Sequence, residues 1–148
     1  MDKVELKLCF PGLAGCRFEI TSARTRFYNC IAWAAGETHR RWWPDKMNVD
    51  YWPEGVPREA TLEAFIAAYA TLGYEACDNG NYESGFEKIV IFTKPAGTPT
   101  HAARQLPGGN WTSKLGDEED IEHELRGIEC LRYGYARQFM KRPTNPGQ

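Results

Sequence analysis

Hydrophobic and polar residues alternate at the start of the chain. The segment KVELKLCF places charged and apolar residues in turn, which predicts a half-buried strand that ends at the turn sequence PGLAG. RFEI predicts a second short strand, and the polar run TSARTR that follows it predicts a connector. We therefore expect N-terminal strands and a connector over residues 1–27.

Three later segments have the pattern of helices. One begins at Asn29, a favourable N-cap residue, and runs through NCIAWAAGETHRRWW. The strongest lies in REATLEAFIAAYATLG, where apolar residues recur on one stripe and Gly73 stands at the expected C-cap. The third, DEEDIEHELRGI, has Asp117 as its N-cap and would carry His123 on a solvated face.

Strand patterns dominate the rest of the second half. YEAC and KIVIFTK predict strands, THAARQL and WTSKL predict a hairpin around Gly108 and Gly109, and YGYARQFMKR is suited to close the sheet. Residues 143–148 have the composition of a flexible tail. The expected architecture is one α+β domain over residues 1–148, with a helical N-terminal half packed on a C-terminal antiparallel sheet.

Composition narrows the classes of function. A formal charge of -2 argues against nucleic acid as a partner, and no apolar run is long enough to cross a membrane. The five cysteines include no CxxC pair, so reduced thiols in a cytoplasmic compartment are expected rather than a disulfide framework. His123 with Glu122 or Asp120 lacks the spacing of metal ligands, and no cofactor motif is found, so we expect neither metal nor cofactor.

Cys30 and His101 are the residues with candidate chemistry. A thiol attacks as its thiolate, and a helix N-terminus beside an imidazolium lowers the pKa of a thiol. Cys30 would stand at such a helix start, whereas a buried structural cysteine is the alternative interpretation. Of the other histidines, His39 lies too far along the same helix and His123 is expected in solvent, which leaves His101 on a strand. A nucleophile on a helix with its base on a distant strand is typical of cysteine hydrolases.

The segments YNCIAWA and THAARQLPGGNWTSKLG, from Tyr28 to Asp120, resemble the core of the papain-like and transglutaminase-like cysteine hydrolases. The sequences of these and neighbouring segments are also similar to a bacterial domain family without an assigned function. The first resemblance implies a papain-like fold and acyl transfer at an amide or thioester through a covalent thioester. It implies Cys30 as nucleophile, His101 as general base and acid, and an oxyanion site made by the Cys30 N–H with Asn29 or Tyr28.

The third member of such a triad stays open. A two-residue turn at Gly108 and Gly109 pairs Leu106 with Trp111, and no hydrogen-bond acceptor then faces His101. Asp117 lies close in sequence and is the preferred partner, whereas a bulge that shifts the register by one residue would present Ser113. A backbone carbonyl is a third possibility.

Two classes of function follow. The first is a cysteine-dependent amide or peptide hydrolase or acyl transferase, with a polypeptide or another amide as substrate. The second is a non-catalytic protein-binding module on the same fold, which would use the aromatic segment from Trp42 to Trp52. Arg104 and Lys114 in the hairpin are expected to be solvated, with recognition of an anionic group as the alternative.

Overall fold

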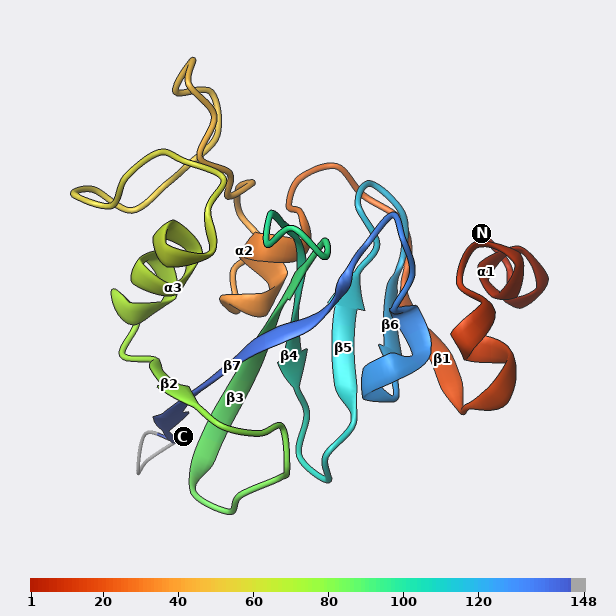
Figure 1. Ribbon diagram of the computed structural model, residues 1–148. Coiled ribbons are helices and arrows are strands. Elements are labelled where there is room, and N and C mark those ends of the chain that lie inside the picture. Colours follow the sequence, from red (N-terminus) through yellow and green to blue (C-terminus); the bar gives the residue numbers. More distant parts are fainter. Residues whose placement is uncertain (145–148) are drawn as a thin grey trace.

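A computed structural model describes residues 1–144, and these residues fold around one antiparallel sheet. The seven strands of this part are arranged in the order β1-β6-β5-β4-β3-β7-β2, and all neighbouring strands are antiparallel (Figure 1). Their bounds are β1 Phe18–Ser22, β2 Glu75–Cys77, β3 Phe86–Thr93, β4 Pro99–Gln105, β5 Trp111–Lys114, β6 Asp120–His123 and β7 Tyr135–Pro143. The sheet therefore contains strands from both halves of the chain.

The helices are short and lie on both faces of the sheet. They are α1 Lys3–Cys9, α2 Cys30–Ala34 and α3 Leu62–Ala70, with two 3₁₀ turns, η1 Pro11–Gly15 and η2 Leu125–Ile128. The predicted fold class, a papain-like α+β domain with a helical N-terminal half, is therefore wrong. The N-terminal half supplies the edge strand β1, and its three α-helices are short and divided between the two faces of the sheet, so they form no helical half packed on one side.

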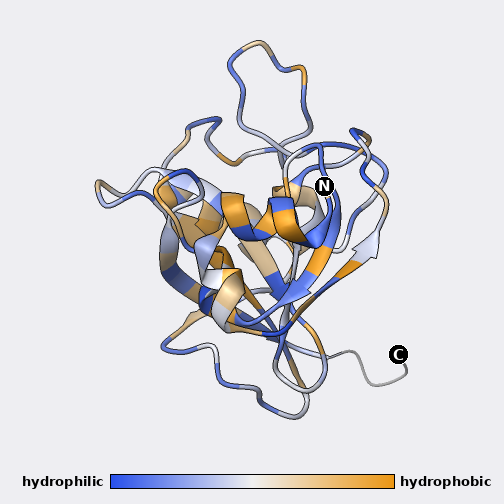
Figure 2. Ribbon diagram, turned by 90° about the vertical axis from the view of Figure 1, so that its right-hand side faces the viewer, coloured by the Kyte–Doolittle hydropathy of each residue, from blue (hydrophilic) through white to orange (hydrophobic). Residues whose placement is uncertain are grey.

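Alternate residues of the central strands build two cores. Ile89, Ile91 and Ala102 face α2 and α3, where Ile31, Phe65 and Tyr69 are fully buried. We call this side the first face. Val90, Phe92 and Ala103 point to the opposite side, the second face, where α1 and η1 contribute Leu6 and Leu13. In Figure 2, hydrophobic residues accordingly gather in the central elements, and the outer loops are mostly hydrophilic.

Several predicted elements are confirmed, with exceptions at the N-terminus and after residue 117. The helix after Asn29 begins as predicted but ends at Ala34, so the rest of the segment through Trp43 is not helical. The helix over residues 62–70 and the hairpin of β4 and β5 are present. Residues 3–9 form α1 instead of a strand, because Asp2 and Glu5 make a capping box at its start. The expected helix after Asp117 is β6 followed by η2, since the segment pairs with both β1 and β5.

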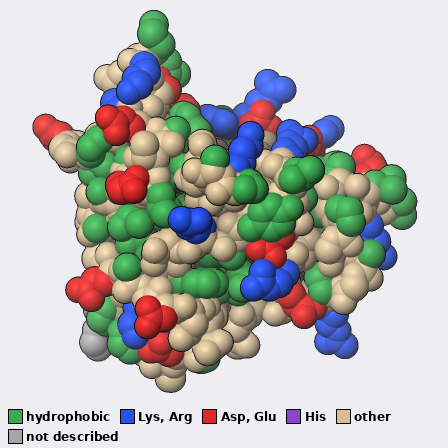
Figure 3. Space-filling model, in the orientation of Figure 1, with side chains coloured by type: hydrophobic (Ala, Val, Ile, Leu, Met, Phe, Trp, Pro, Cys, Tyr) green, Lys and Arg blue, Asp and Glu red, His purple; other side chains and the backbone are tan. Residues whose placement is uncertain are grey.

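The ends of the chain and its long loop complete the description. Trp42 and Trp52 are buried in the first core, whereas Met47 and Val49 are exposed on the loop between them. This loop projects from the top of Figure 1, and hydrophobic atoms form its tip in Figure 3. The expected tail of residues 143–148 overlaps the end of β7 at Pro143, and the Thr144 N–H donates to the Gly85 carbonyl. Residues 145–148 of that tail lie outside the described residues. No helix of residues 1–144 is long and apolar enough to span a membrane.

Candidate active site

Cys30 is the first residue of α2, and its position is fixed by the residue before it. The Asn29 Oδ1 accepts the N–H groups of Ala32 at 3.2 Å and Trp42 at 3.0 Å, and its Nδ2 donates to the Trp42 carbonyl at 2.7 Å. Asn29 thus caps α2 and ties it to the long loop. The Cys30 side of this helix packs in the first core, where the residue is only 9% exposed.

His101 lies in β4 and is fully buried. It pairs with Phe92 of β3, and its ring lies 5.3 Å from that of Phe92 and 4.9 Å from that of Tyr133. Phe92 belongs to the core of the second face, so the imidazole packs on the side of the sheet opposite α2. The fold alone would therefore separate Cys30 from His101.

Both residues nevertheless belong to the lining of one open cavity of about 400 Å³. β4 and β5 are paired only at Arg104–Thr112 and Gln105–Trp111, so the sheet is not closed between them beside His101. The Cys30 thiol lies near the backbone N–H of Ala102, the residue that follows His101 in β4. The remaining lining residues include Trp43, Lys94, Pro99, Thr100, Gly116 and Tyr133. The structure therefore places Cys30 and His101 around one cavity, although the His101 side chain itself has no exposed surface.

A chain of hydrogen bonds fixes the tautomer of His101. His123 Nδ1 lies 2.7 Å from the Glu124 carbonyl oxygen, which can only accept, so this nitrogen carries the proton. His123 Nε2 then accepts from the Ser113 hydroxyl at 2.6 Å, and Ser113 in turn accepts from His101 Nε2 at 3.0 Å. His101 Nδ1 is left as a bare acceptor, buried and without a partner among the described residues. The Cys30 thiol forms no hydrogen bond with this nitrogen. An unpartnered buried acceptor is costly, which makes Nδ1 the unusual atom of this chain.

The same contacts correct two expectations about this region. His123 is fully buried in β6 and not solvated. Asp117 does not hold the imidazole: its carboxylate is paired with Arg41 at 2.9 Å and with Arg26 at 3.7 Å. Ser113 instead lies within hydrogen-bond distance of the ring, because Gln105 pairs with Trp111, one residue away from the register that the two-residue turn predicts.

Burial sets the protonation states of the pair. It raises the pKa of the Cys30 thiol to about 11, although the backbone N–H groups of Ala102, Ile31 and Cys30 act in the opposite direction. It lowers the pKa of His101 to about 3, assisted by the charge that His123 would carry, and that of His123 to about 4. The expected low thiol pKa is therefore wrong. At neutral pH the resting pair is a neutral thiol and a neutral imidazole.

Tyr28 and Asn29, the candidates for an oxyanion donor, already have partners. The Tyr28 hydroxyl donates to Asp120 Oδ2 at 2.7 Å, and burial raises its pKa to about 12. The Asn29 amide is used by Trp42. The donors near the sulfur are instead the N–H groups of Cys30 and Ile31 at the start of α2.

Lys114 and Asp120 are buried charges that the sequence analysis missed. Lys114 is fully buried instead of solvated, and its Nζ donates to the carbonyls of Gly116 and Glu118. Asp120 is also buried, and its Oδ1 has no hydrogen-bond partner among residues 1–144. Within those residues, no group of three or more histidine, cysteine, aspartate or glutamate side chains is placed to hold a metal ion.

Comparison with known proteins gives one match. No curated protein and no solved structure is significantly similar to the chain. A family model described as a domain of unknown function (DUF7689) matches residues 19–141, a range that includes all of the residues around the Cys30 cavity and at least part of every strand. The chain therefore belongs to the DUF7689 family.

Proposed function

We propose that the chain is a cysteine-dependent amide or peptide hydrolase or acyl transferase, with Cys30 as nucleophile and His101 as proton acceptor. One observation carries this proposal: Cys30 and His101 line the same open cavity, and Nδ1 of His101 is an acceptor without a partner among the described residues. The proposal depends on this site and not on a papain-like fold. Ser113 would be a positioning residue that holds the ring through Nε2.

The protonation states determine how such a site would act. Because thiol and imidazole are both neutral, the proton leaves sulfur only as sulfur attacks. Cys30 Sγ forms a bond to the carbonyl carbon while its proton passes to Nδ1 of His101, and the N–H groups of Cys30 and Ile31 receive the developing oxyanion. The C–N bond then breaks, and the amine leaves with the proton from Nδ1.

The resulting thioester is resolved by water or another nucleophile. That nucleophile gives its proton to Nδ1 of His101 as it attacks, and the C–S bond breaks. The proton then returns from Nδ1 to sulfur, which restores the neutral pair. Water as the nucleophile makes the enzyme a hydrolase, and an amine or alcohol makes it a transferase.

Labelling with a peptidyl acyloxymethyl ketone, followed by peptide mapping, tests this proposal. An electrophile of this type alkylates a thiol that has a working proton acceptor, with loss of its carboxylate, and we expect it to modify Cys30. His101→Gln should slow the labelling by about a hundredfold, and Ser113→Ala by a smaller factor. The exposed Cys9 is an internal reference whose labelling should not change, and His39→Gln is the matched exposed-histidine control.

Simple alkylation distinguishes a neutral pair from a preformed ion pair. A pKa of about 11 leaves about a hundredfold less thiolate than an ordinary cysteine has. Iodoacetamide should therefore modify Cys9 before Cys30. The proposal is contradicted if the ketone reaches Cys30 only after denaturation, or if Ser113→Ala and His101→Gln label as fast as the wild type.

The long loop supports a second candidate, a protein-binding module. Asp45 orders its tip: the carboxylate accepts the N–H groups of Val49 at 2.7 Å and Asp50 at 2.9 Å, and Arg58 pairs with it at 3.0 Å. Met47 is thereby held 83% exposed beside Val49 on a fixed loop. If binding is the function, Cys30→Ala should preserve it and Met47→Ser should abolish it; the hydrolase proposal predicts the reverse.

A further inference from the structure

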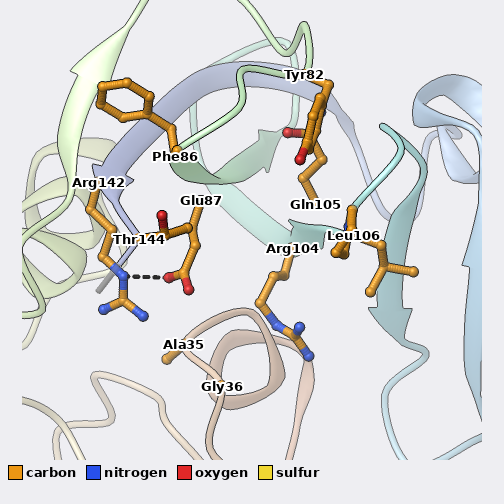
Figure 4. A pocket seen from close by; sticks show the side chains of 12 residues that line it. Ala35, Gly36, Tyr82, Phe86, Glu87, Arg104, Gln105, Leu106, Arg142 and Thr144 are labelled. Atoms are coloured by element: carbon orange, nitrogen blue, oxygen red, sulfur yellow. Dashed lines mark hydrogen bonds and ion pairs between the residues drawn. The ribbon is translucent and has the colours of Figure 1, made fainter. Parts of the chain in front are cut away.

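A second cavity, of about 380 Å³, lies at the opposite end of α2 from Cys30. Ala35 and Gly36 from the end of this helix line it, together with residues of β3, β4 and β7 (Figure 4). None of the residues around the Cys30 cavity contributes to it. Its volume falls in the lower part of the range that small-molecule sites occupy.

Arg104 is the unusual group of this cavity. Its Nε donates to the Trp33 carbonyl at 3.3 Å, and the guanidinium lies 4.9 Å from the centre of the Trp33 ring. No carboxylate of residues 1–144 forms an ion pair with it, and its two terminal nitrogens have no protein acceptor in that part of the chain. Burial accordingly lowers the pKa of Arg104. A partly buried cation without an anion is unfavourable unless a ligand supplies one.

The neighbouring charges define the charge of the ligand. Arg142 also lines the cavity, but its Nε pairs with Glu87 at 2.7 Å and another nitrogen donates to the Leu72 carbonyl. Figure 4 shows this pair on one side, with Arg104 extending separately toward Ala35 and Gly36. Two arginines and one glutamate leave one positive charge in excess. This balance fits a monoanion.

The remaining lining describes the body of the ligand. Phe86, Leu106 and Pro107 give the cavity an apolar part, and Tyr82 stands at its exposed side. We propose that this cavity binds a small organic carboxylate with an apolar or aromatic body, whose carboxylate is held by the terminal nitrogens of Arg104. A guanidinium presents two parallel N–H groups that match the two oxygens of a carboxylate. This site is independent of the hydrolase proposed for Cys30.

The indole N–H signals of the five tryptophans provide a direct readout by ¹⁵N-edited NMR. The probe is 4-phenylbutyrate, and its uncharged amide, 4-phenylbutanamide, is the control ligand. The carboxylate should shift the Trp33 signal saturably, with a Kd of about 1 mM or tighter, because Trp33 lies against Arg104. The Trp52 signal, whose N–H donates to Pro57, should not move. The amide should shift neither signal.

Two variants complete the test. Arg104→Gln should weaken binding by at least about tenfold, whereas Arg126→Gln, which removes an exposed arginine outside the cavity, should leave it unchanged. Should Arg104→Gln fail to fold, Glu87→Gln tests the charge balance, since it removes the cavity's carboxylate and should tighten binding severalfold. Equal binding of the amide, or binding that neither variant changes, would overturn the proposal.

Discussion

The two faces of the sheet bury polar groups in different ways. Along β5, Lys114 points to the first face and lies 5.4 Å from the Tyr28 ring, while Ser113 points to the second and bonds two histidines. The first face thus buries Lys114 near α2. The second buries a neutral chain that ends on a backbone carbonyl, and its buried charge, Lys88, is paired with Glu83 at 3.0 Å. Strand alternation places Lys114 and the histidine chain on opposite faces of the sheet.

The stability of the first face should depend most on the packing of its aromatic side chains. Phe65 is fully buried, with its ring 5.1 Å from that of Trp52 and 5.5 Å from that of Trp43. Phe65→Ala should lower the free energy of unfolding by about 3–5 kcal/mol, since it leaves a cavity between α3 and the loop. Urea unfolding followed by circular dichroism measures it.

Phe27→Ala is the matched control, because Phe27 is 80% exposed. It should change the free energy of unfolding by less than about 0.5 kcal/mol. A small loss for Phe65→Ala would show that the first face does not depend on this aromatic cluster.

The second face predicts a loss of stability in acid. The pKa values of His101 and His123 fall to about 3 and about 4 in the folded chain, below the ordinary value of about 6.5. Between pH 6.5 and 4 the unfolded chain binds protons that the folded chain does not, so stability decreases as pH falls through this window. At pH 5 the cost is about 2 kcal/mol for each histidine.

Urea unfolding at pH 8, 6 and 5 measures this dependence. His123→Gln should reduce the number of protons taken up on unfolding by about one. His39 is exposed, so His39→Gln should lose nearly the same free energy of unfolding between pH 8 and pH 5 as the wild type does. If the wild type is as stable at pH 5 as at pH 8, the assignment of His101 and His123 as buried neutral histidines is wrong.

The same comparison explains which features the sequence could predict. Asn29 marks the start of a helix through local capping, and this cap is present. The assignment of a helix after Asp117 failed because its acidic first turn is a local signal, whereas β6 forms through pairing with β1 and β5. Because of that error, the contact between His123 and Ser113 could not be predicted. With residues 120–123 as a strand, the two side chains lie on one buried face.

The pair itself could be predicted only in part. Cys30 and His101 were selected by residue type and position, and both line one cavity. Asp117 was preferred over Ser113 because the register of the hairpin depends on the conformation of its Gly-Gly turn, which the sequence leaves open. Burial determines the pKa of Cys30 and of His101, and it depends on contacts with residues distant in sequence, such as Tyr133 against His101.

The smallest expected effect concerns the connection between the first face and the aromatic loop. Asn29 and Thr61 are both N-caps, but Asn29 is buried and also satisfies the N–H and carbonyl of Trp42, whereas the Thr61 side chain bonds, within residues 1–144, only to the Ala64 N–H. Thr61→Ala should therefore cost about 1 kcal/mol, the ordinary value of a cap, and Asn29→Ala about 2–3 kcal/mol. Urea unfolding of the two variants gives the comparison, and equal losses would mean that Trp42 finds other partners. Because the cap also fixes Cys30, Asn29→Ala should slow ketone labelling of that thiol while Thr61→Ala does not, which separates the loss of a helix cap from the loss of the site.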